Sequence, residues 1–478
     1  MPNSAATRGA WLLGPALVAG VAYLDPGNVA SNMTAGARFG YLLVWVVVLG
    51  NAMAWLIQYL SAKLGVVTGR SLAELLGERI ANPWARRAYW LQAELVAGAT
   101  DVAEVIGGAI ALHLLFGVPL PVGGLVTGAV SIALLLVQQR RGARAFELVV
   151  IGLLAVIASG FAYGVFVSPP AAAAIAAGLV PRFAGTDSVL LSASILGATI
   201  MPHAIYAHSA LARDRFAAQA APTAPTARPD PAAPAAPAAL ARAGTPPEPA
   251  SVAAGAGLGP GTGAGTGAPT QAQAARRAHI SSAATEPPDI DRTARIPRLL
   301  RATRWDVTVA LVIAGTVNLA ILLLAAANLT GATGTETLEG AHAALASGLG
   351  AATATLFAVG LLASGLASTA VGAYAGAELM HGLLRVRMPL LLRRLVTLAP
   401  AIALLAAGVD PTWALVLSQV VLSFGIPFAL VPLVWLTARR DVLGGHRNQW
   451  WTTGGGVLAS VFLATLNGLL LWLVLTGG

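Results

Sequence analysis

The 478-residue sequence predicts an all-α integral membrane protein with about eleven transmembrane helices. Hydrophobic residues make up 56% of the chain and charged residues only 10%, whereas a soluble domain carries roughly 25% charged residues. A transmembrane helix needs about 20 mostly apolar residues, and such stretches recur along the whole chain. These observations exclude a soluble enzyme. Because the chain has no cysteine, they also exclude disulfides and thiolate metal sites.

Eleven apolar segments are expected to cross the bilayer. They are residues 11–36, 40–63, 88–115, 120–138, 146–168, 188–211, 305–328, 344–380, 391–408, 412–437 and 453–476. The segment 344–380 is long and rich in small residues, so part of it is expected to be re-entrant or irregular. The first segment does not resemble a cleaved signal peptide, because Asp25-Pro26-Gly27 interrupts its apolar run.

The basic residues predict how the chain is oriented. If the N-terminus is cytoplasmic, all but two of the 29 Lys and Arg residues fall on the cytoplasmic side, and only Arg38 and Arg182 lie outside. This is the positive-inside bias of membrane proteins. The expected topology is multi-pass, with the N-terminus cytoplasmic and the C-terminus outside. The formal charge of +9 therefore reflects topology and predicts no nucleic-acid partner.

The chain is expected to divide into three parts. Residues 1–211 hold helices 1–6, with a first repeat over 11–168, and residues 305–478 hold helices 7–11. Between them, residues 212–304 form an Ala/Pro-rich cytoplasmic loop that we expect to be disordered, because it has almost no large apolar side chains to bury. The simplest interpretation is a flexible connection. Its proline rhythm leaves open an unknown partner that binds polyproline II helices.

Two apolar segments contain a break near their middle. The first reads Leu24-Asp25-Pro26-Gly27-Asn28, and the sixth contains Ile200-Met201-Pro202-His203. Proline removes a backbone donor and glycine permits non-helical dihedral angles. Irregular backbone at membrane depth is tolerated only where it lines a cavity or is buried in protein. A matching pair of breaks in two halves of a chain points to an inverted-repeat transporter with a site near the bilayer midplane.

These two motifs resemble the signatures of the Nramp family of proton-coupled divalent-metal transporters. The similar stretches are DPGN at 25–28, MPHAIYAHSAL at 201–211, DVAE at 101–104, SQVVLSF at 418–424 and the arginine pair at 393–394. The resemblance covers most of the chain outside the N-terminal tail and residues 212–304. It implies a LeuT-like fold, in which helices 1–5 and 6–10 form inverted repeats, helices 1 and 6 are broken and helix 11 is added. The resemblance also implies that the protein is located in the bacterial plasma membrane.

The resemblance implies a set of metal ligands. On this sequence they are Asp25, Asn28, the backbone carbonyl of Ala198, Met201 and, in at least one state, Gln419. Their chemistry agrees with the family's cargo. Oxygen ligands alone would suit Mg²⁺ or Ca²⁺, but a thioether is a soft ligand that favours Mn²⁺, Fe²⁺ and similar transition metals. These metals and H⁺ are expected as transported substrates, with no permanently bound cofactor.

The resemblance also implies a proton pathway through ionisable side chains. Its residues here are Asp25, Glu104, Asp101, His203, Arg393, Arg394 and His208. Asp101 and Glu104 are three residues apart and so share one helix face. A buried carboxylate without a partner would be driven to protonate, so the two arginines are expected to pair with these acids. A purely structural ion pair is the alternative, and His208 could instead cap a half-helix.

Three other functions fit the sequence less well than proton-coupled metal import. A relative specialised for Mg²⁺ generally lacks the methionine, whereas Met201 is present. A non-transporting, Nramp-like metal sensor would have eroded ligands and a large folded cytosolic domain, and neither is seen. An amino-acid carrier of the same fold would be expected to repel its substrate's carboxylate at Asp25. The expected partners are divalent metal ions, protons and the lipid bilayer.

Overall fold

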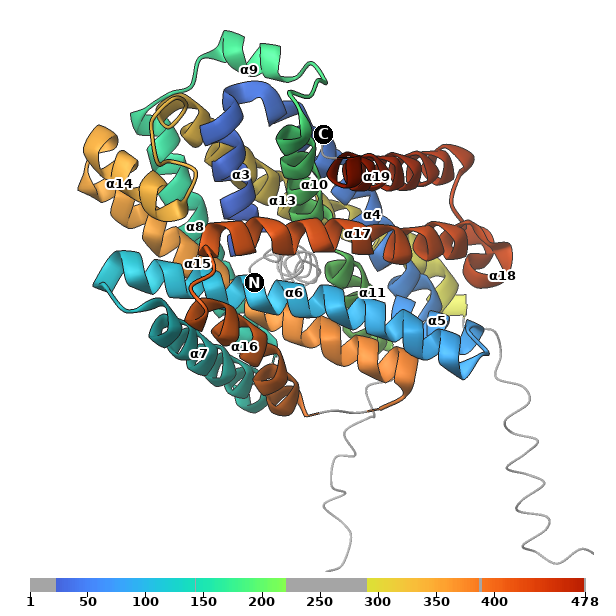
Figure 1. The fold of residues 1–478 in the computed structure, drawn as a ribbon. Helices are drawn as coiled ribbons and strands as arrows, with labels where there is room; N and C mark the ends of the chain where they lie inside the picture. Colours follow the sequence, from blue (N-terminus) through green and yellow to red (C-terminus); the bar gives the residue numbers. More distant parts are fainter. Residues whose placement is uncertain (1–22, 142, 221–289, 387–388, 477–478) are drawn as a thin grey trace, which may run out of the picture. The chain divides into compact units, whose positions relative to one another are not determined.

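Every regular element in the described part of the chain is a helix, which confirms the all-α class. The computed structural model describes residues 23–141, 143–220, 290–386 and 389–476 (Figure 1). The helices in chain order are α3 (Pro26–Phe39), η1 (Gly40–Leu43), α4 (Val44–Thr68), α5 (Leu72–Arg79), α6 (Pro83–Phe116), α7 (Leu120–Arg141), α8 (Ala143–Val167), α9 (Ala172–Gly178), α10 (Thr186–Ile200), α11 (Pro202–Ala220), α13 (Ile290–Asn328), α14 (Leu338–Leu349), α15 (Ala351–Leu379), η2 (Met380–Leu384), α16 (Leu390–Ala406), α17 (Pro411–Ala438), α18 (Arg440–Leu443), η3 (Gly444–His446) and α19 (Trp450–Thr476).

Seven of the described helices are long and apolar enough to cross a membrane, or eight if α8 and α9, bent by 119°, form one span. The expected number of eleven is therefore not reproduced in the described residues. The first expected segment starts in residues 1–22, which are not described, and η1 joins its remainder to α4 in one apolar stretch. The apolar part of α7 and the 17 residues of α16 are shorter than the others.

The structure shows where helices end in two of the expected segments, 212–304 and 344–380. Helix α11 continues to Ala220 and α13 begins at Ile290, so helices extend into both ends of the 212–304 segment. Its middle, residues 221–289, lies outside the described residues. In the segment 344–380, the irregular point is Gly350, which separates α14 from α15 with φ of 91°. That left-handed conformation favours glycine.

Helices α6 and α17 lie at the centre of the packing and carry Asp101, Glu104 and Gln419 of the candidate site. Helix α15 packs along α6 and α8, and α17 packs against α10, α6 and α3. Figure 1 shows α17 passing across the ends of α3 and α10. Glycines permit the closest approaches. A Cβ at Gly65 of α4 would lie 2.1 Å from the Ser209 carbonyl oxygen of α11, so these two backbones nearly touch.

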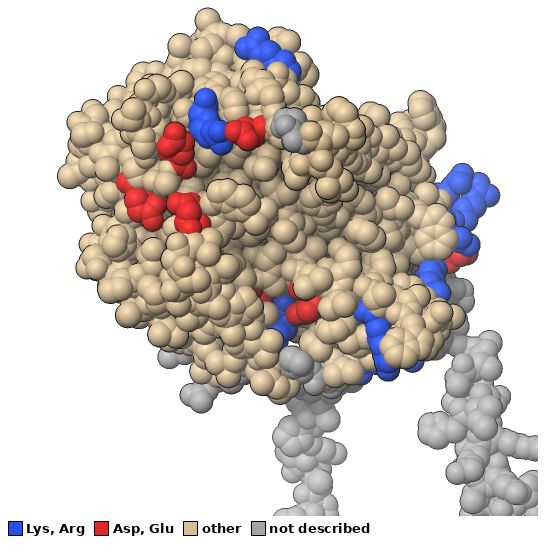
Figure 2. All heavy atoms as spheres, in the orientation of Figure 1, with Lys and Arg blue, Asp and Glu red and all other residues tan. Residues whose placement is uncertain are grey.

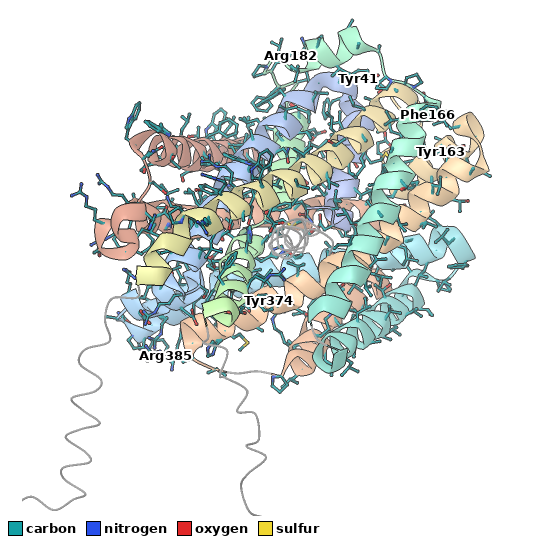
Figure 3. All side chains as sticks on the ribbon, turned by 180° about the vertical axis from the view of Figure 1, so that it is seen from behind. Tyr41, Tyr163, Phe166, Arg182, Tyr374 and Arg385 are labelled. Carbon is teal, nitrogen blue, oxygen red and sulfur yellow. The ribbon has the colours of Figure 1, made fainter. Side chains whose placement is uncertain are left out.

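The surface fits a membrane environment. On the face shown in Figure 2, most of the described surface carries no charge, and charged side chains gather in a few small groups. Figure 3 shows Arg182 at one end of the helices and Arg385 at the other. Those are the opposite sides to which the predicted topology assigns the two residues.

We predict that Gly65→Ala destabilises the protein. The new methyl group would meet backbone rather than a flexible side chain, and overpacking of this kind costs about 1–3 kcal/mol. Gly468→Ala in α19 is the matched control, because a Cβ there meets nothing within 4 Å and alanine favours a helix. Thermal unfolding in detergent should show a lower midpoint for Gly65→Ala only. Equal midpoints for the two variants would contradict this account of the contact.

Candidate metal site and buried ion-pair cluster

Asp25 stands at the start of α3 and caps it. The Asp25 Oδ1 atom accepts a hydrogen bond from the Asn28 backbone N–H at 2.8 Å, and Pro26 occupies the first turn, where a missing N–H costs nothing. The carboxylate is fully buried. An ionised group at this depth is expensive unless it has partners. The cap occupies Oδ1 and leaves Oδ2 to partners from other helices.

The second break separates α10 from α11 at Met201. This buried residue has φ of 43°, in the left-handed region that side chains rarely adopt. Pro202 follows it and begins α11. In a continuous helix the Ala198 carbonyl would accept a bond from the N–H of residue 202, but proline has none. The sequence therefore leaves a buried carbonyl oxygen and a buried thioether at the same point.

A pair of serines sets the two breaks at similar depth. Ser31 of α3 and Ser194 of α10 have their Oγ atoms 2.6 Å apart. Asp25 lies six residues before Ser31, and Met201 lies seven residues after Ser194. At 1.5 Å per residue, the two breaks are about 9 Å and about 10.5 Å from the serine contact. The Ser194 hydroxyl also donates to the Val416 carbonyl at 3.0 Å, which ties α17 to the same place.

Gln419 of α17 connects the two broken helices. Its Nε2 donates to Asp25 Oδ2 at 2.9 Å. A Cβ at Gly27 would lie 1.8 Å from that nitrogen, and a Cβ at Gly197 would lie 1.9 Å from the Gln419 carbonyl oxygen. Both glycines are thus needed for the close approach. The Gln419 Oε1 atom is buried and accepts no hydrogen bond from the described residues.

Further amides surround the start of α3. Asn28 Nδ2 donates to the Tyr23 carbonyl at 2.5 Å, and Asn32 Nδ2 donates to Asn28 Oδ1 at 2.7 Å. Asn318 of α13 donates to the same Tyr23 carbonyl at 3.0 Å, and Ser364 of α15 donates to the Leu24 carbonyl. Sequence reasoning missed Asn32 and Ser364. The position of Asn32 one helical turn after Asn28 was the available signal.

A second group of ionisable side chains lies between α6 and α16. Arg394 Nη1 donates to Asp101 Oδ1 at 2.5 Å and to Glu104 Oε2 at 3.2 Å. Arg393 Nη1 lies 3.4 Å from Asp101 Oδ2. All four side chains are at least 96% buried. The structure thus brings together both expected acids and both expected arginines.

Glu94 extends this cluster by two helical turns along α6. Its Oε1 accepts from Arg393 Nε at 2.9 Å. Gly376 of α15 makes room for this arginine, since a Cβ there would lie 2.0 Å from Arg393 Cζ. The cluster therefore contains three carboxyl groups and two guanidinium groups. Complete ionisation would leave one unbalanced negative charge in a largely buried site.

The start of α3 adjoins the turn of α6 that carries Glu104. A Cβ at Gly107, one turn beyond Glu104, would lie 2.0 Å from Pro26 Cβ. A Cβ at Gly365 of α15 would lie 3.0 Å from the Glu104 carbonyl oxygen and 3.5 Å from Pro26 Cγ. Pro26 is thus wedged between α6 and α15, with Asp25 directly before it in the chain.

The two histidines lie in different surroundings. His203 Nδ1 is 3.2 Å from the hydroxyl of Thr100, the residue before Asp101, so it lies beside the α6 cluster. His208 Nδ1 is 2.8 Å from Gln58 Oε1 of α4. The structure therefore places His208 against α4 instead of joining it to the acids, and it caps no half-helix because it lies within α11.

Acidic residues also occur outside the spans, on α14 and at the start of α17. Burial raises the pKa of Glu339 on α14, and the nearby Asp410 raises it further. The Leu338 backbone N–H donates to the Thr412 hydroxyl at 2.9 Å and so links α14 to α17. The predicted topology assigns these carboxyl groups to the outer side of the membrane.

The donor set at the breaks is mixed. Among the described residues, no group of three or more His, Cys, Asp or Glu side chains could hold a metal ion. Any ion bound between α3 and α10 would be held by one carboxylate together with amide, carbonyl and thioether donors. Such a set lacks the Cys and His ligands that hold permanent structural zinc ions.

Comparisons with known proteins agree over almost the whole chain. Residues 16–230 and 274–473 match the family described as natural resistance-associated macrophage protein-like, Nramp. The chain is 52% identical over 467 residues to a protein of Mycobacterium tuberculosis H37Rv named divalent metal cation transporter MntH, covering 98% of this chain and 92% of that one. It is 38% identical over 457 residues to the protein of that name from Bacillus subtilis 168, covering 95% and 90%.

Solved structures agree with the sequence comparison. The crystal structure of the Eremococcus coleocola manganese transporter in complex with an aromatic bis-isothiourea compound has a TM-score of 0.73 and 30% identity. The match covers 98% of this chain and 87% of that one. The resemblance inferred from the DPGN and MPH motifs is thereby confirmed. The chain belongs to the Nramp family, a family of transporters.

Proposed function

We propose that this chain imports divalent transition metal ions such as Mn²⁺ and Fe²⁺ across the bacterial plasma membrane, together with protons, by alternating access. Metal transport is supported by the relatives, which are named as divalent metal cation transporters and a manganese transporter. The observation that carries the proposal is that Gln419 meets both broken helices, at Asp25 Oδ2 and, through its carbonyl, at Gly197, four residues before Met201. The orientation we propose has the N-terminus cytoplasmic and the C-terminus outside, as the basic residues favour.

The metal ligands we propose are Asp25, Asn28, the Ala198 carbonyl, Met201 and Gln419. Asp25 Oδ2 and Gln419 already meet, and Gln419 Oε1 is a buried oxygen in need of a partner. An amide oxygen has two lone pairs, so Asn28 Oδ1 can accept from Asn32 and still bind a cation. Asn32 then acts by fixing the orientation of that amide, as outer-shell partners commonly do.

Met201 is the proposed source of selectivity. Its thioether is a poor ligand for the hard ions Mg²⁺ and Ca²⁺ but an acceptable one for softer transition metals. Mg²⁺ also resists losing its water shell. With a thioether in the set, dehydration is compensated better for Mn²⁺ or Fe²⁺ than for the more abundant hard ions.

We place the proton route along α6. Cation binding at Asp25 favours loss of any proton held there, and Glu104 lies on the turn that adjoins Pro26. From Glu104 the cluster continues to Asp101 and its arginine partners. Three carboxyl groups against two guanidinium groups leave room for one proton, which neutralises the excess charge. His203 is beside this route, whereas His208 contacts Gln58 of α4.

The first prediction concerns Asp25. Asp25→Ala removes the only carboxylate proposed at the metal site, so Mn²⁺ uptake into proteoliposomes should fall to the level of empty vesicles. Asp441→Asn is the control, because this exposed carboxylate lies outside the proposed route and pairs only with Arg439 among the described residues. Normal Mn²⁺ uptake by Asp25→Ala would refute the proposed site.

The second prediction concerns the selectivity assigned to Met201. Met201→Ala should retain measurable Mn²⁺ uptake but allow excess Mg²⁺ or Ca²⁺ to compete, because only oxygen donors remain. Met380→Ala, a change to another buried methionine at the end of α15, should leave discrimination intact. If both variants exclude Mg²⁺ as well as the unchanged protein does, the thioether is not the selectivity element.

The third prediction separates proton movement from metal movement. Glu104→Gln keeps the size of the side chain but cannot carry a proton, so Mn²⁺ uptake should persist with less acidification of the vesicle interior per ion. An internal pH dye and radiolabelled Mn²⁺ measure both quantities in the same preparation. Unchanged acidification per Mn²⁺ would remove Glu104 from the proposed route.

A further inference from the structure

A cavity of about 550 Å³ lies beside the first turns of α6, away from the metal site. Its lining includes Trp84, Arg86, Arg87 and Leu91 from α6, with Leu384 and Val386 from the end of η2 and the residues after it. No aspartate or glutamate lines it. The cavity is therefore apolar with two fixed positive charges, and nothing in the proposed transport cycle uses it.

The two arginines are held by neutral groups. Arg86 Nη1 donates to the Gly77 carbonyl at 3.3 Å, and the Arg87 guanidinium lies 4.9 Å from the ring centroid of Trp84. Neither forms an ion pair with a carboxylate of the described residues. Both guanidinium groups keep donors free for an anion, and arginine matches phosphate oxygens well.

An apolar strip leads from the cavity along α6. Trp84, Leu91 and Leu95 are 72%, 51% and 63% exposed and share one helix face, since they are seven and four residues apart. The strip is about 16 Å long from Trp84 to Leu95. An anion site that opens onto such a strip fits an amphiphile with a charged head and an extended apolar chain.

The cavity lies at the end of the helices that we assign to the cytoplasm. Figure 3 shows Arg385, which stands between the lining residues Leu384 and Val386, at the end opposite Arg182. The cytoplasmic leaflet is where anionic lipids attract basic segments, and basic pockets between membrane helices hold their head groups. Tryptophan also prefers this interfacial level.

We propose that this cavity binds one anionic phospholipid, with the phosphate of its head group between Arg86 and Arg87 and an acyl chain along Trp84, Leu91 and Leu95. This inference rests on the proposed orientation but not on metal binding. The site touches α6 two turns before Glu94, so an occupied cavity braces the helix that carries the buried acids.

Native mass spectrometry tests the proposal. The full chain is released from detergent in the presence of phosphatidylglycerol or of phosphatidylcholine with identical acyl chains, and the bound lipid is counted. Phosphatidylglycerol should bind more tightly than phosphatidylcholine. The Arg86→Gln/Arg87→Gln double variant should weaken phosphatidylglycerol binding by about twenty-five-fold, at about fivefold per basic residue. The matched control Arg440→Gln/Arg447→Gln removes two exposed charges from the same side and should change binding less than twofold. Equal losses in the two double variants would mean non-specific attraction and overturn the site.

A second variant tests the space inside the cavity separately from its charge. Ala88→Trp fills a lining position while keeping both arginines, so it too should weaken phosphatidylglycerol binding. Retained binding in this variant, or displacement of the lipid by millimolar inorganic phosphate, would contradict an acyl-chain site. Mn²⁺ uptake measured on the same preparations distinguishes failure of the lipid site from failure of the proposed function. If lipid binding is absent but Mn²⁺ uptake is normal, only the lipid site is refuted. If Mn²⁺ uptake is absent but lipid binds as expected, only the proposed function is refuted.

Discussion

The contact of α17 with the two broken helices is the interaction on which the rest of the site depends. Gln419 reaches Asp25 only because Gly27 and Gly197 have no side chains in the way. The same contact brings the end of α10 against α17 and so fixes where Met201 lies. Small residues at helix crossings permit such approaches within membranes, where apolar burial gives little driving force. A cation site made of scattered single donors requires this degree of positional control.

The buried ion-pair cluster poses a different physical problem. Removing charges from water is costly, and a buried pair returns that cost only with good geometry. Arg394 meets both acids of α6, and Arg393 is shared between Asp101 and Glu94. The arrangement is nearly neutral, with one carboxyl group in excess. Because of that imbalance, binding one proton makes the cluster neutral, and the remaining ion pairs still hold α6 and α16 together.

Local sequence signals were sufficient to predict the all-α class, the family and the break at Met201, because Pro202 and the apolar run around it act within one helix. They also identified Asp101, Glu104 and both arginines as partners. Contacts between distant helices were not predictable in detail. Nothing near Ser364 in the sequence shows that it holds the Leu24 carbonyl, whereas the spacing of Asn28 and Asn32 by one helical turn does indicate their contact. The number of spans was also unreliable, since η1 joins two expected segments and α16 is short.

The central claim is that a thioether and a carboxylate, one at each helix break, both bind the transported ion. X-ray absorption spectroscopy of bound Cd²⁺ tests this claim most directly. The chain has no cysteine and six methionines, so any sulfur next to the metal must come from a methionine. The account predicts one sulfur among oxygen neighbours in the unchanged protein and none in Met201→Leu. A metal shell without sulfur, or sulfur that persists in the variant, would contradict it.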